Sequence, residues 1–173
     1  AYSCGILARS GEAVVHDHDP DELALCRRLA EEAATIMADT YLGMSDESDH
    51  HFAPFFITAN AGDPVPQELT EAHVRAAFRG TIWPKCQLDI EPLKKEGEWW
   101  RRASGQPLAN KDARALGAWR ALVAWFGSQK ELHGASFVSI NDREEISCFF
   151  PRMVLALTQK GSLVGLFGCV VWS

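Results

Sequence analysis

The sequence predicts an α+β fold in which helices lie on both sides of one mostly antiparallel sheet. Two long segments repeat apolar residues at helical spacing, one over residues 20–39 and one that begins at Asn110 or Asp112. Three strand-like segments close the chain, over 135–140, 152–159 and 163–172. In the last of these strands, apolar residues stand at the positions that point to either face of the sheet. A strand of that kind is covered on both faces.

The first long helix has a clear N-terminal signal. Asp19 suits the N-cap and Pro20 the first helical position, while Glu22 stands where it would complete a capping box. Gly43 is a helix-stop residue shortly after the last apolar position. The apolar positions that define the helix are Leu25, Cys26, Leu29, Ala33, Ile36 and Met37.

A strand and two short helices are expected in the middle of the chain. Residues 52–58 are rich in aromatic and β-branched side chains, and Pro54 predicts an edge strand or a bulge. Thr70 can cap a short helix. For residues 82–107, which mix tryptophans, prolines and charges, we expect one short helix near 93–102 between loops.

The second long helix is expected to end at Gly134. Residues 160–162 (Lys-Gly-Ser) form a tight turn that makes the last two strands a hairpin. Residues 2–15 are expected to form a short strand or hairpin. The face of the second helix comprises Leu116, Trp119, Leu122, Val123 and Phe126.

Length and charge narrow the classes of function. The 173 residues fit a single domain, 1–173, with residues 1–18 as an N-terminal extension. The formal charge is −6, whereas nucleic-acid phosphates demand a basic face, so a basic protein is the better-matched partner. No apolar run approaches the roughly 20 residues that span a bilayer. No signal-peptide pattern opens the chain.

The cysteines and the short motifs predict neither a metal site nor a cofactor. The five cysteines are widely spread without a CxxC pair, which argues against structural zinc and favours reduced thiols in a cytoplasmic setting. Glycine-rich nucleotide motifs are absent from the sequence. Residues 16–19 (His-Asp-His-Asp) are interpreted as a solvated turn before the first helix, because adjacent residues on one turn rarely converge on one ion.

The most informative stretch is 41–56, where polar residues stand between apolar flanks. Such a loop can bind a metal, catalyse proton transfer or present carboxylates to a basic partner. Metal binding or catalysis would need further ligand or catalytic side chains from other parts of the sequence. The histidines His73 and His133 do not stand in an HxH or HxxxH spacing, which metal sites often use. The polar residues of the stretch are Ser45, Asp46, Glu47, Ser48, Asp49, His50 and His51.

This stretch carries a resemblance to a known family. A long amphipathic helix, then Gly-Met-Ser-(Asp)-Glu-Ser-Asp (residues 43–49), then Phe-x-Pro-Phe leading into a strand, resembles the nuclease A inhibitor family. The second half agrees, with a long helix, a short strand and a terminal hairpin that runs through Gly-x-Leu-x-Gly to Val-Val. The resemblance covers roughly 19–173 and is strongest at 41–58 and 111–173.

The resemblance implies a three-layer α-β-α sandwich similar to the pathogenesis-related-1-type fold. It also implies a non-enzymatic protein that plugs the active site of a non-specific ββα-metal DNA/RNA endonuclease. In that family a glutamate of the acidic loop and the C-terminal hydroxyl residue reach the catalytic centre, which implies Glu47 and Ser173 here. Asp46 is an insertion relative to the family motif, so the key carboxylate belongs to Asp46 or Glu47.

The resulting hypothesis is an acidic, cytoplasmic inhibitor, monomeric when free, that binds a basic metal-dependent endonuclease without a metal or cofactor of its own. Two alternatives stay open. One is a metal-dependent hydrolase that uses the Asp46 to His51 cluster, and the other is a regulatory protein-binding module that keeps only the scaffold. The expected contact residues are Glu47, Ser173, Asp46, Ser48, Asp49, Trp172, Trp99 and Trp100.

Overall fold

The structure, a computed structural model, describes residues 19–40, 48–49, 51–142 and 149–171. The helices in these residues are α1 (Pro20–Ile36), α2 (Glu71–Ala77), α3 (Gly97–Ala109) and α4 (Ala113–Ser128). The strands are β1 (Ser48–Asp49), β2 (Ala53–Ile57), β3 (Gln87–Pro92), β4 (Leu132–Asn141), β5 (Phe149–Thr158) and β6 (Leu163–Val171). The prediction of an α+β protein is confirmed.

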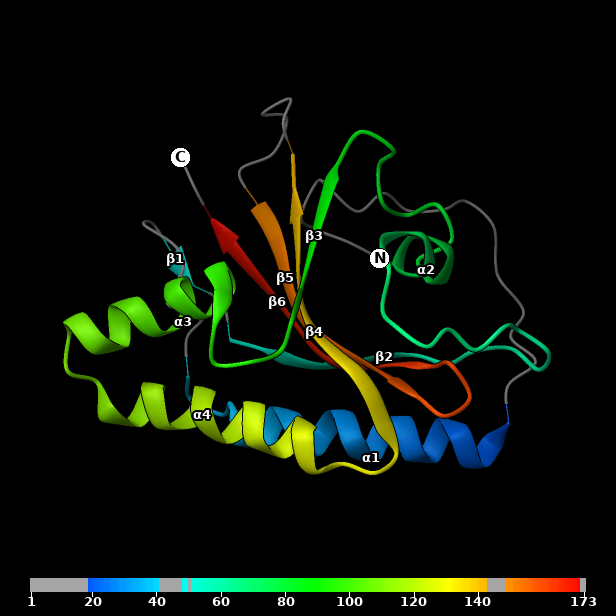
Figure 1. The fold of residues 1–173 in the computed structure, drawn as a ribbon, viewed down its shortest axis with the longest axis horizontal. Helices are drawn as coiled ribbons and strands as arrows, with labels where there is room; N and C mark the ends of the chain where they lie inside the picture. The colour runs from blue at the N-terminus through cyan, green and yellow to red at the C-terminus, as the bar shows by residue number, and fades with distance from the viewer. Residues whose placement is uncertain (1–18, 41–47, 50, 143–148, 172–173) are drawn as a thin grey trace.

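The strands form one sheet in which every pair is antiparallel (Figure 1). The order is β1-β6-β5-β4-β3, and β2 pairs with β6 beside β1. The β5–β6 hairpin turns through residues 160–162, with Leu157 opposite Leu163, as predicted. β1 and β2 therefore share one edge of β6, where β2 pairs with Leu163 to Phe167 and β1 with Val170 and Val171.

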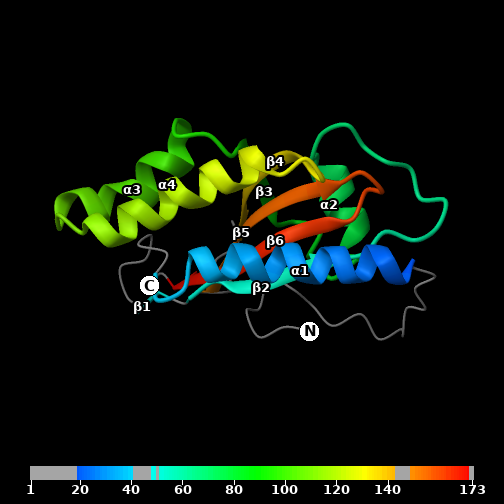
Figure 2. The ribbon, with the colours of Figure 1, turned by 90° about the horizontal axis from the view of Figure 1, so that it is seen from below.

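Alternation along the central strands supplies two separate hydrophobic clusters. On β5, Val154 and Ala156 join a cluster with α1, α3 and α4. The intervening residues Met153, Leu155 and Leu157 join a second cluster, to which α2 contributes. Figures 1 and 2 show α1 and α4 running along one side of the sheet. The expectation that the last strand is covered on both faces is confirmed, since β6 is buried at all positions but Phe167.

α1 begins as predicted, but one of its first residues has another role. The Asp19 side chain accepts a hydrogen bond from the Asp21 amide at 2.8 Å, and Pro20 opens the helix. Glu22, expected to complete a capping box, is only 5% exposed and accepts a hydrogen bond from the Thr158 hydroxyl at 2.5 Å. The Glu22 carboxylate therefore bonds to a buried hydroxyl on β5, and not to the backbone amide of the N-cap residue that a capping box would use. The helix ends at Ile36 rather than at residue 39, and a turn follows.

The segment 82–107 differs most from the expectation. It contains a strand, β3, that pairs with β4 and that we did not predict. The sequence does contain a strand pattern here, because apolar Leu88 and Ile90 alternate with polar Gln87, Asp89 and Glu91 as in a half-buried strand. The tryptophans and prolines around this alternation obscured it. The helix predicted near 93–102 exists as α3 but extends to Ala109.

Gly134 does not end a helix. α4 ends at Ser128, and Gly134 lies within β4 with a positive φ of 62°, where the register with β5 shifts between His133 and Ser136. A left-handed glycine marks a strand irregularity as readily as a helix end, and the sequence does not separate the two cases. The start of α4 is as predicted, with the Asp112 carboxylate as its N-cap.

Two other local predictions are confirmed. The Thr70 hydroxyl accepts a hydrogen bond from the His73 amide at 3.2 Å and caps α2. Pro54 lies in β2, which within the described residues pairs on one side only, with β6. The strand or hairpin expected over 2–15 and the extension 1–18, with its histidines, lie outside the described residues.

Candidate interaction site at one end of the sheet

Two residues of the polar stretch 45–51, called the acidic segment from here on, pair with the end of the last strand. Ser48 pairs with Val171 and Asp49 with Val170, in antiparallel register. β1 therefore forms the edge of the sheet beside the C-terminal end of β6 (Figure 1). Two segments far apart in the sequence, one from the first third and one from the chain's end, are joined by backbone pairing.

Both flanks of the acidic segment are held in the hydrophobic core. Before it, Met37 is 1% exposed and Thr40 is 3% exposed. After it, Phe52 is buried, and its ring meets Trp119 of α4 edge-on at 5.5 Å. These described residues on both sides of the acidic segment are therefore buried.

An aromatic residue lies on the other side of β6. Phe149, the first residue of β5, pairs with Val171, so that Ser48, Val171 and Phe149 follow one another across three strands. Phe149 is 38% exposed and is one of three large exposed hydrophobic residues in the described part of the chain. The sheet end therefore offers an apolar side chain beside the acidic segment.

A buried polar network braces the same end of the sheet. Arg152 of β5, 1% exposed, donates to the Asn141 side-chain oxygen at 3.0 Å and to the backbone carbonyls of Ile140 and Pro151. Asn141 in turn donates to the Asp89 carboxylate at 2.8 Å. Together these bonds tie β3, β4 and β5 to one another where the chain leaves β4.

Arg152 keeps its positive charge in this setting. Burial lowers the pKa of its guanidinium to about 10, with a smaller contribution from the nearby cation of Arg102. The guanidinium is therefore still protonated near neutral pH. It lines a polar hollow of about 400 Å³ between the sheet and α3, together with Asp89, Glu98 and Arg102. Sequence reasoning missed this network, because no local pattern links residues on three strands.

The two tryptophans expected at an interface have different environments. Trp99 is 2% exposed, stacks on Phe137 at 5.3 Å and donates its indole N–H to the Pro92 carbonyl at 3.0 Å. It is a core residue, and its burial argues against the predicted contact with a partner. Trp100 is half-buried and packs edge-on against Trp99 at 5.5 Å, so part of its ring stays accessible.

The other predicted contact residues are placed only in part. The structure gives the backbone pairing of Ser48 and Asp49. Asp46, Glu47, Trp172 and Ser173, together with His50 of the alternative cluster, lie outside the described residues. Chain connectivity still brings Glu47 and Trp172 within one peptide bond of a paired residue.

Neither a metal centre nor a membrane segment is found in the described residues. They contain no group of three or more His, Cys, Asp and Glu side chains that could hold a metal ion. His133 lies at the opposite end of β4 from Asn141, and its Nε2 faces the Pro66 carbonyl at 3.1 Å. No helix in this part of the chain has the length and apolar character that crossing a bilayer requires.

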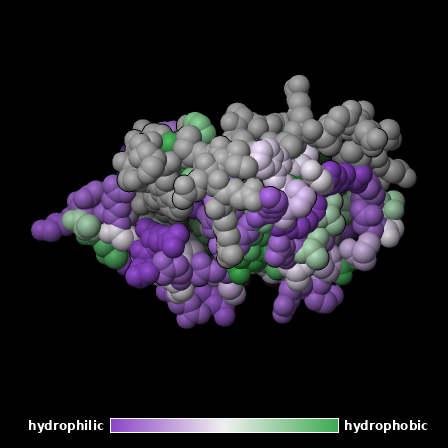
Figure 3. Space-filling view, turned by 90° about the horizontal axis from the view of Figure 1, so that it is seen from above, coloured by the Kyte–Doolittle hydropathy of each residue, from purple (hydrophilic) through white to green (hydrophobic). Residues whose placement is uncertain are grey.

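Figure 3 views the molecule from the side that is uppermost in Figure 1, where the described residues are mostly hydrophilic with scattered apolar ones. Comparison with models of known protein families finds no match, and comparison with curated proteins finds none either.

Proposed function

We propose that the protein is a non-enzymatic inhibitor of a non-specific ββα-metal DNA/RNA endonuclease, and that the acidic segment and the C-terminus together occlude the nuclease's active site. One observation carries the proposal: the pairing of Ser48 with Val171 and of Asp49 with Val170. The sequence-based hypothesis requires Glu47 and Ser173 to act at one place, although they stand in distant parts of the chain. This pairing brings the neighbours of both residues together.

The chemistry of such a contact is favourable. Nucleases of this kind bind phosphate with arginines and a divalent ion, and a carboxylate with a terminal hydroxyl and carboxylate offers similar oxygen ligands. Carboxylate–arginine pairs are strong and often bidentate. The formal charge of −6 would also speed encounter with a basic partner, more so at low salt. Phe149 adds an apolar contact at the rim of the charged region.

The finer features of the hypothesis belong to the same proposal. The helices on the two faces of the sheet support a three-layer α-β-α sandwich similar to the pathogenesis-related-1-type fold. A single domain, 1–173, acts in the cytoplasm as a monomer when free and needs no cofactor. Trp100, with its partly accessible ring, is retained as a secondary contact, whereas Trp99 is not.

The first test is an inhibition assay. Purified protein is mixed in increasing ratio with several ββα-metal nucleases, and the digestion of double-stranded DNA is followed. We expect stoichiometric loss of cleavage with at least one enzyme, and a nuclease from an unrelated structural class serves as the control. Undiminished cleavage by every ββα-metal enzyme at excess protein would contradict the proposal.

Variants then test the assignment of residues. We expect Glu47→Ala, or deletion of Ser173, to cost about 2–5 kcal/mol of affinity, because a nuclease cation is left buried without its partner. Asp46→Ala decides which of the two adjacent carboxylates matters. Asp39→Ala is the matched control, since Asp39 is exposed and pairs with Arg114 at 3.2 Å on the surface. Equal, small effects of all four changes would remove the site assignment.

The two alternatives give other results. A metal-dependent hydrolase that uses residues 46–51 would retain a stoichiometric divalent ion when purified without chelators or a histidine tag. A protein-binding module that keeps only the scaffold would neither retain metal nor inhibit a nuclease. Elemental analysis of the purified protein therefore separates the first alternative, and the inhibition assay the second.

A further inference from the structure

A second candidate site lies at the opposite end of β6. The loop that follows β2, the helix α2 and the β5–β6 turn enclose a pocket of about 410 Å³. That volume falls within the range of small-molecule sites, roughly 300–1,000 Å³. β6 spans nine residues, so roughly 26 Å of strand separates the pocket from the acidic segment. The pocket is therefore distinct from the proposed nuclease contact.

Two buried polar atoms in this pocket have no hydrogen-bond partner among the described residues. They are the side-chain oxygen of Asn60 and the Nε2 atom of His73. An unpaired buried polar group costs about 1–3 kcal/mol, so such groups are uncommon in a folded protein. Both residues line the same pocket, so the two side chains stand together as candidate ligand contacts.

The His73 side chain lines the pocket, and its Nε2 atom is buried. Burial lowers the pKa of His73, while the Asp63 carboxylate and the Gly161 carbonyl oppose that shift. The ring is therefore neutral near pH 7 and carries one proton. A neutral imidazole has one nitrogen that accepts a hydrogen bond, and Nε2, buried without a partner among the described residues, is the nitrogen left for a ligand. With the proton on Nδ1, Nε2 is an acceptor, as is the Asn60 oxygen.

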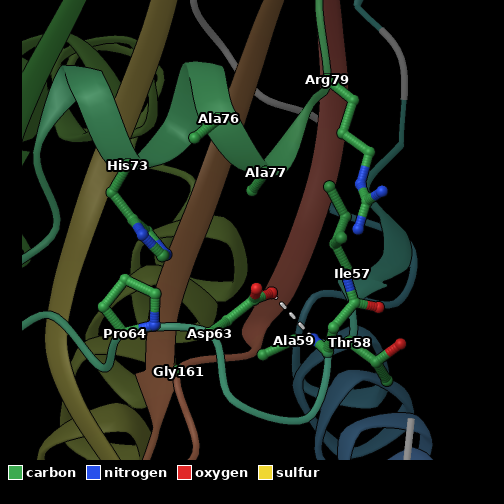
Figure 4. A pocket seen from close by; sticks show the side chains of 11 residues that line it. Ile57, Thr58, Ala59, Asp63, Pro64, His73, Ala76, Ala77, Arg79 and Gly161 are labelled. Carbon is green, nitrogen blue, oxygen red and sulfur yellow. Dashed lines mark hydrogen bonds between the residues drawn. The ribbon is translucent and has the colours of Figure 1, made fainter. Parts of the chain in front are cut away.

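The pocket also contains two opposite charges. The Asp63 carboxylate accepts a hydrogen bond from the backbone N–H of Asn60 at 2.9 Å, which holds the carboxylate at the pocket wall. Arg79 follows α2 and lines the same pocket. Figure 4 shows His73 and Arg79 entering from opposite sides, with Asp63 between them. Among the ion pairs of the described residues, none involves Asp63 or Arg79.

The remaining walls are mainly aliphatic. Ile57, Pro64, Ala76 and Ala77 supply apolar surface from the end of β2, the following loop and one face of α2. A ligand that satisfied only the polar atoms would leave this surface against water. The pocket thus combines three acceptors, one cation and an aliphatic wall.

We propose that this pocket binds a small aliphatic zwitterion of the free amino-acid class. Its ammonium group donates to Asp63, Asn60 and His73, its carboxylate pairs with Arg79, and its hydrocarbon chain lies against Ile57 and the alanines of α2. An ammonium has three N–H donors, which matches the three acceptors. The carboxylate is the anionic group of such a molecule, and carboxylates pair strongly with the forked N–H donors of a guanidinium.

The test uses three probes that share one hydrocarbon skeleton. L-leucine carries both charges, 4-methylpentanoate lacks the ammonium, and 3-methylbutylamine lacks the carboxylate. Each is titrated into the full chain, and binding is followed by calorimetry and by ¹H–¹⁵N NMR. We expect L-leucine to shift amides of residues 57–64 and 73–79, and each single-charge probe to bind at least about tenfold more weakly.

Variants separate binding from folding. Arg79 has a positive φ of 50°, a conformation that suits glycine, so Arg79→Gly removes the cation without straining the backbone. Asp63→Asn keeps an acceptor for the Asn60 amide but removes the charge. Each should weaken L-leucine binding at least about tenfold with an unchanged thermal midpoint, whereas Arg120→Gln, on the exposed side of α4, should change neither.

Three results would overturn the inference. These are no binding of L-leucine at millimolar concentration, equal binding of all three probes, or full binding by both charge-removing variants. None of them bears on the nuclease assay, because the pocket and the acidic segment lie at opposite ends of β6.

Discussion

At the scale of single residues, Glu22 is the clearest example of a side chain used differently from its local pattern. Its carboxylate is buried between α1 and β5, where it accepts hydrogen bonds from the Thr158 hydroxyl and from the Cys26 thiol. Burial raises the pKa of the Cys26 thiol to about 12, and the Glu22 charge adds to that rise. The cluster joins the first helix to the centre of the sheet.

Loss of the Glu22 carboxylate should therefore destabilise the protein. We expect Glu22→Ala to lower the free energy of unfolding by about 1–3 kcal/mol, because buried hydrogen bonds are lost. Glu31→Ala, on the exposed side of the same helix, should stay within about 0.5 kcal/mol. Urea unfolding measures both values. If the two variants unfold at the same urea concentration, the buried cluster contributes no net stability.

At the scale of elements, α3 depends on a strand for its first turn. Its N-cap residue, Glu96, makes no side-chain capping bond. Instead the Glu91 carboxylate of β3 accepts from the backbone amides of Glu98 and Trp99, at 3.0 and 3.1 Å. A negative charge also suits the positive end of the helix dipole. β3, the strand that we did not predict, thus supplies the cap for the first turn of α3.

This contact gives a prediction for α3. Glu91→Ala should reduce stability by about 1 kcal/mol, as is usual when a helix loses its N-cap, and should speed exchange of the Glu98 and Trp99 amides. Glu96→Ala is the matched control, because its side chain makes no capping bond. Urea unfolding and amide exchange by NMR provide the measurements. A larger loss for Glu96→Ala would show that the cap is local after all.

At the scale of the whole molecule, the described residues form a sheet whose centre is better protected than its edges. β5 has strand partners on both sides and is buried from Pro151 to Thr158. Among the described residues, β2 and β3 each pair on one side; β2 has no buried position and β3 has one, Leu88. The acidic segment and the pocket proposed for zwitterions lie at opposite ends of this scaffold, on the same long strand.

Hydrogen exchange should follow this order. We expect amides of 152–157 to exchange only through global unfolding, and those of 53–57 and 87–92 to exchange earlier through local opening. Exchange at several low urea concentrations distinguishes the two routes, since only global unfolding responds strongly to urea. Edge strands as slow as β5 would show that the fold opens as a single unit.

Much of the candidate site was open to prediction, but its assembly was not. The crowding of polar residues over 45–51 is local and needs no structure to detect. Trp99 was ambiguous for a physical reason, because a tryptophan in a charged, helical context serves equally as core or contact. Only its stacking on Phe137, contributed by β4, decides the question.

The sequence by itself determined the α+β class, the caps of α1, α2 and α4 and the terminal hairpin, because these depend on residues that are neighbours in the chain. Tertiary structure alone decided which distant groups meet: Glu22 with Thr158, Glu91 with the start of α3, and Ser48 with Val171. Strand register and burial are set by packing across the whole sheet, to which no local pattern is sensitive. The proposed functions both depend on such long-range meetings.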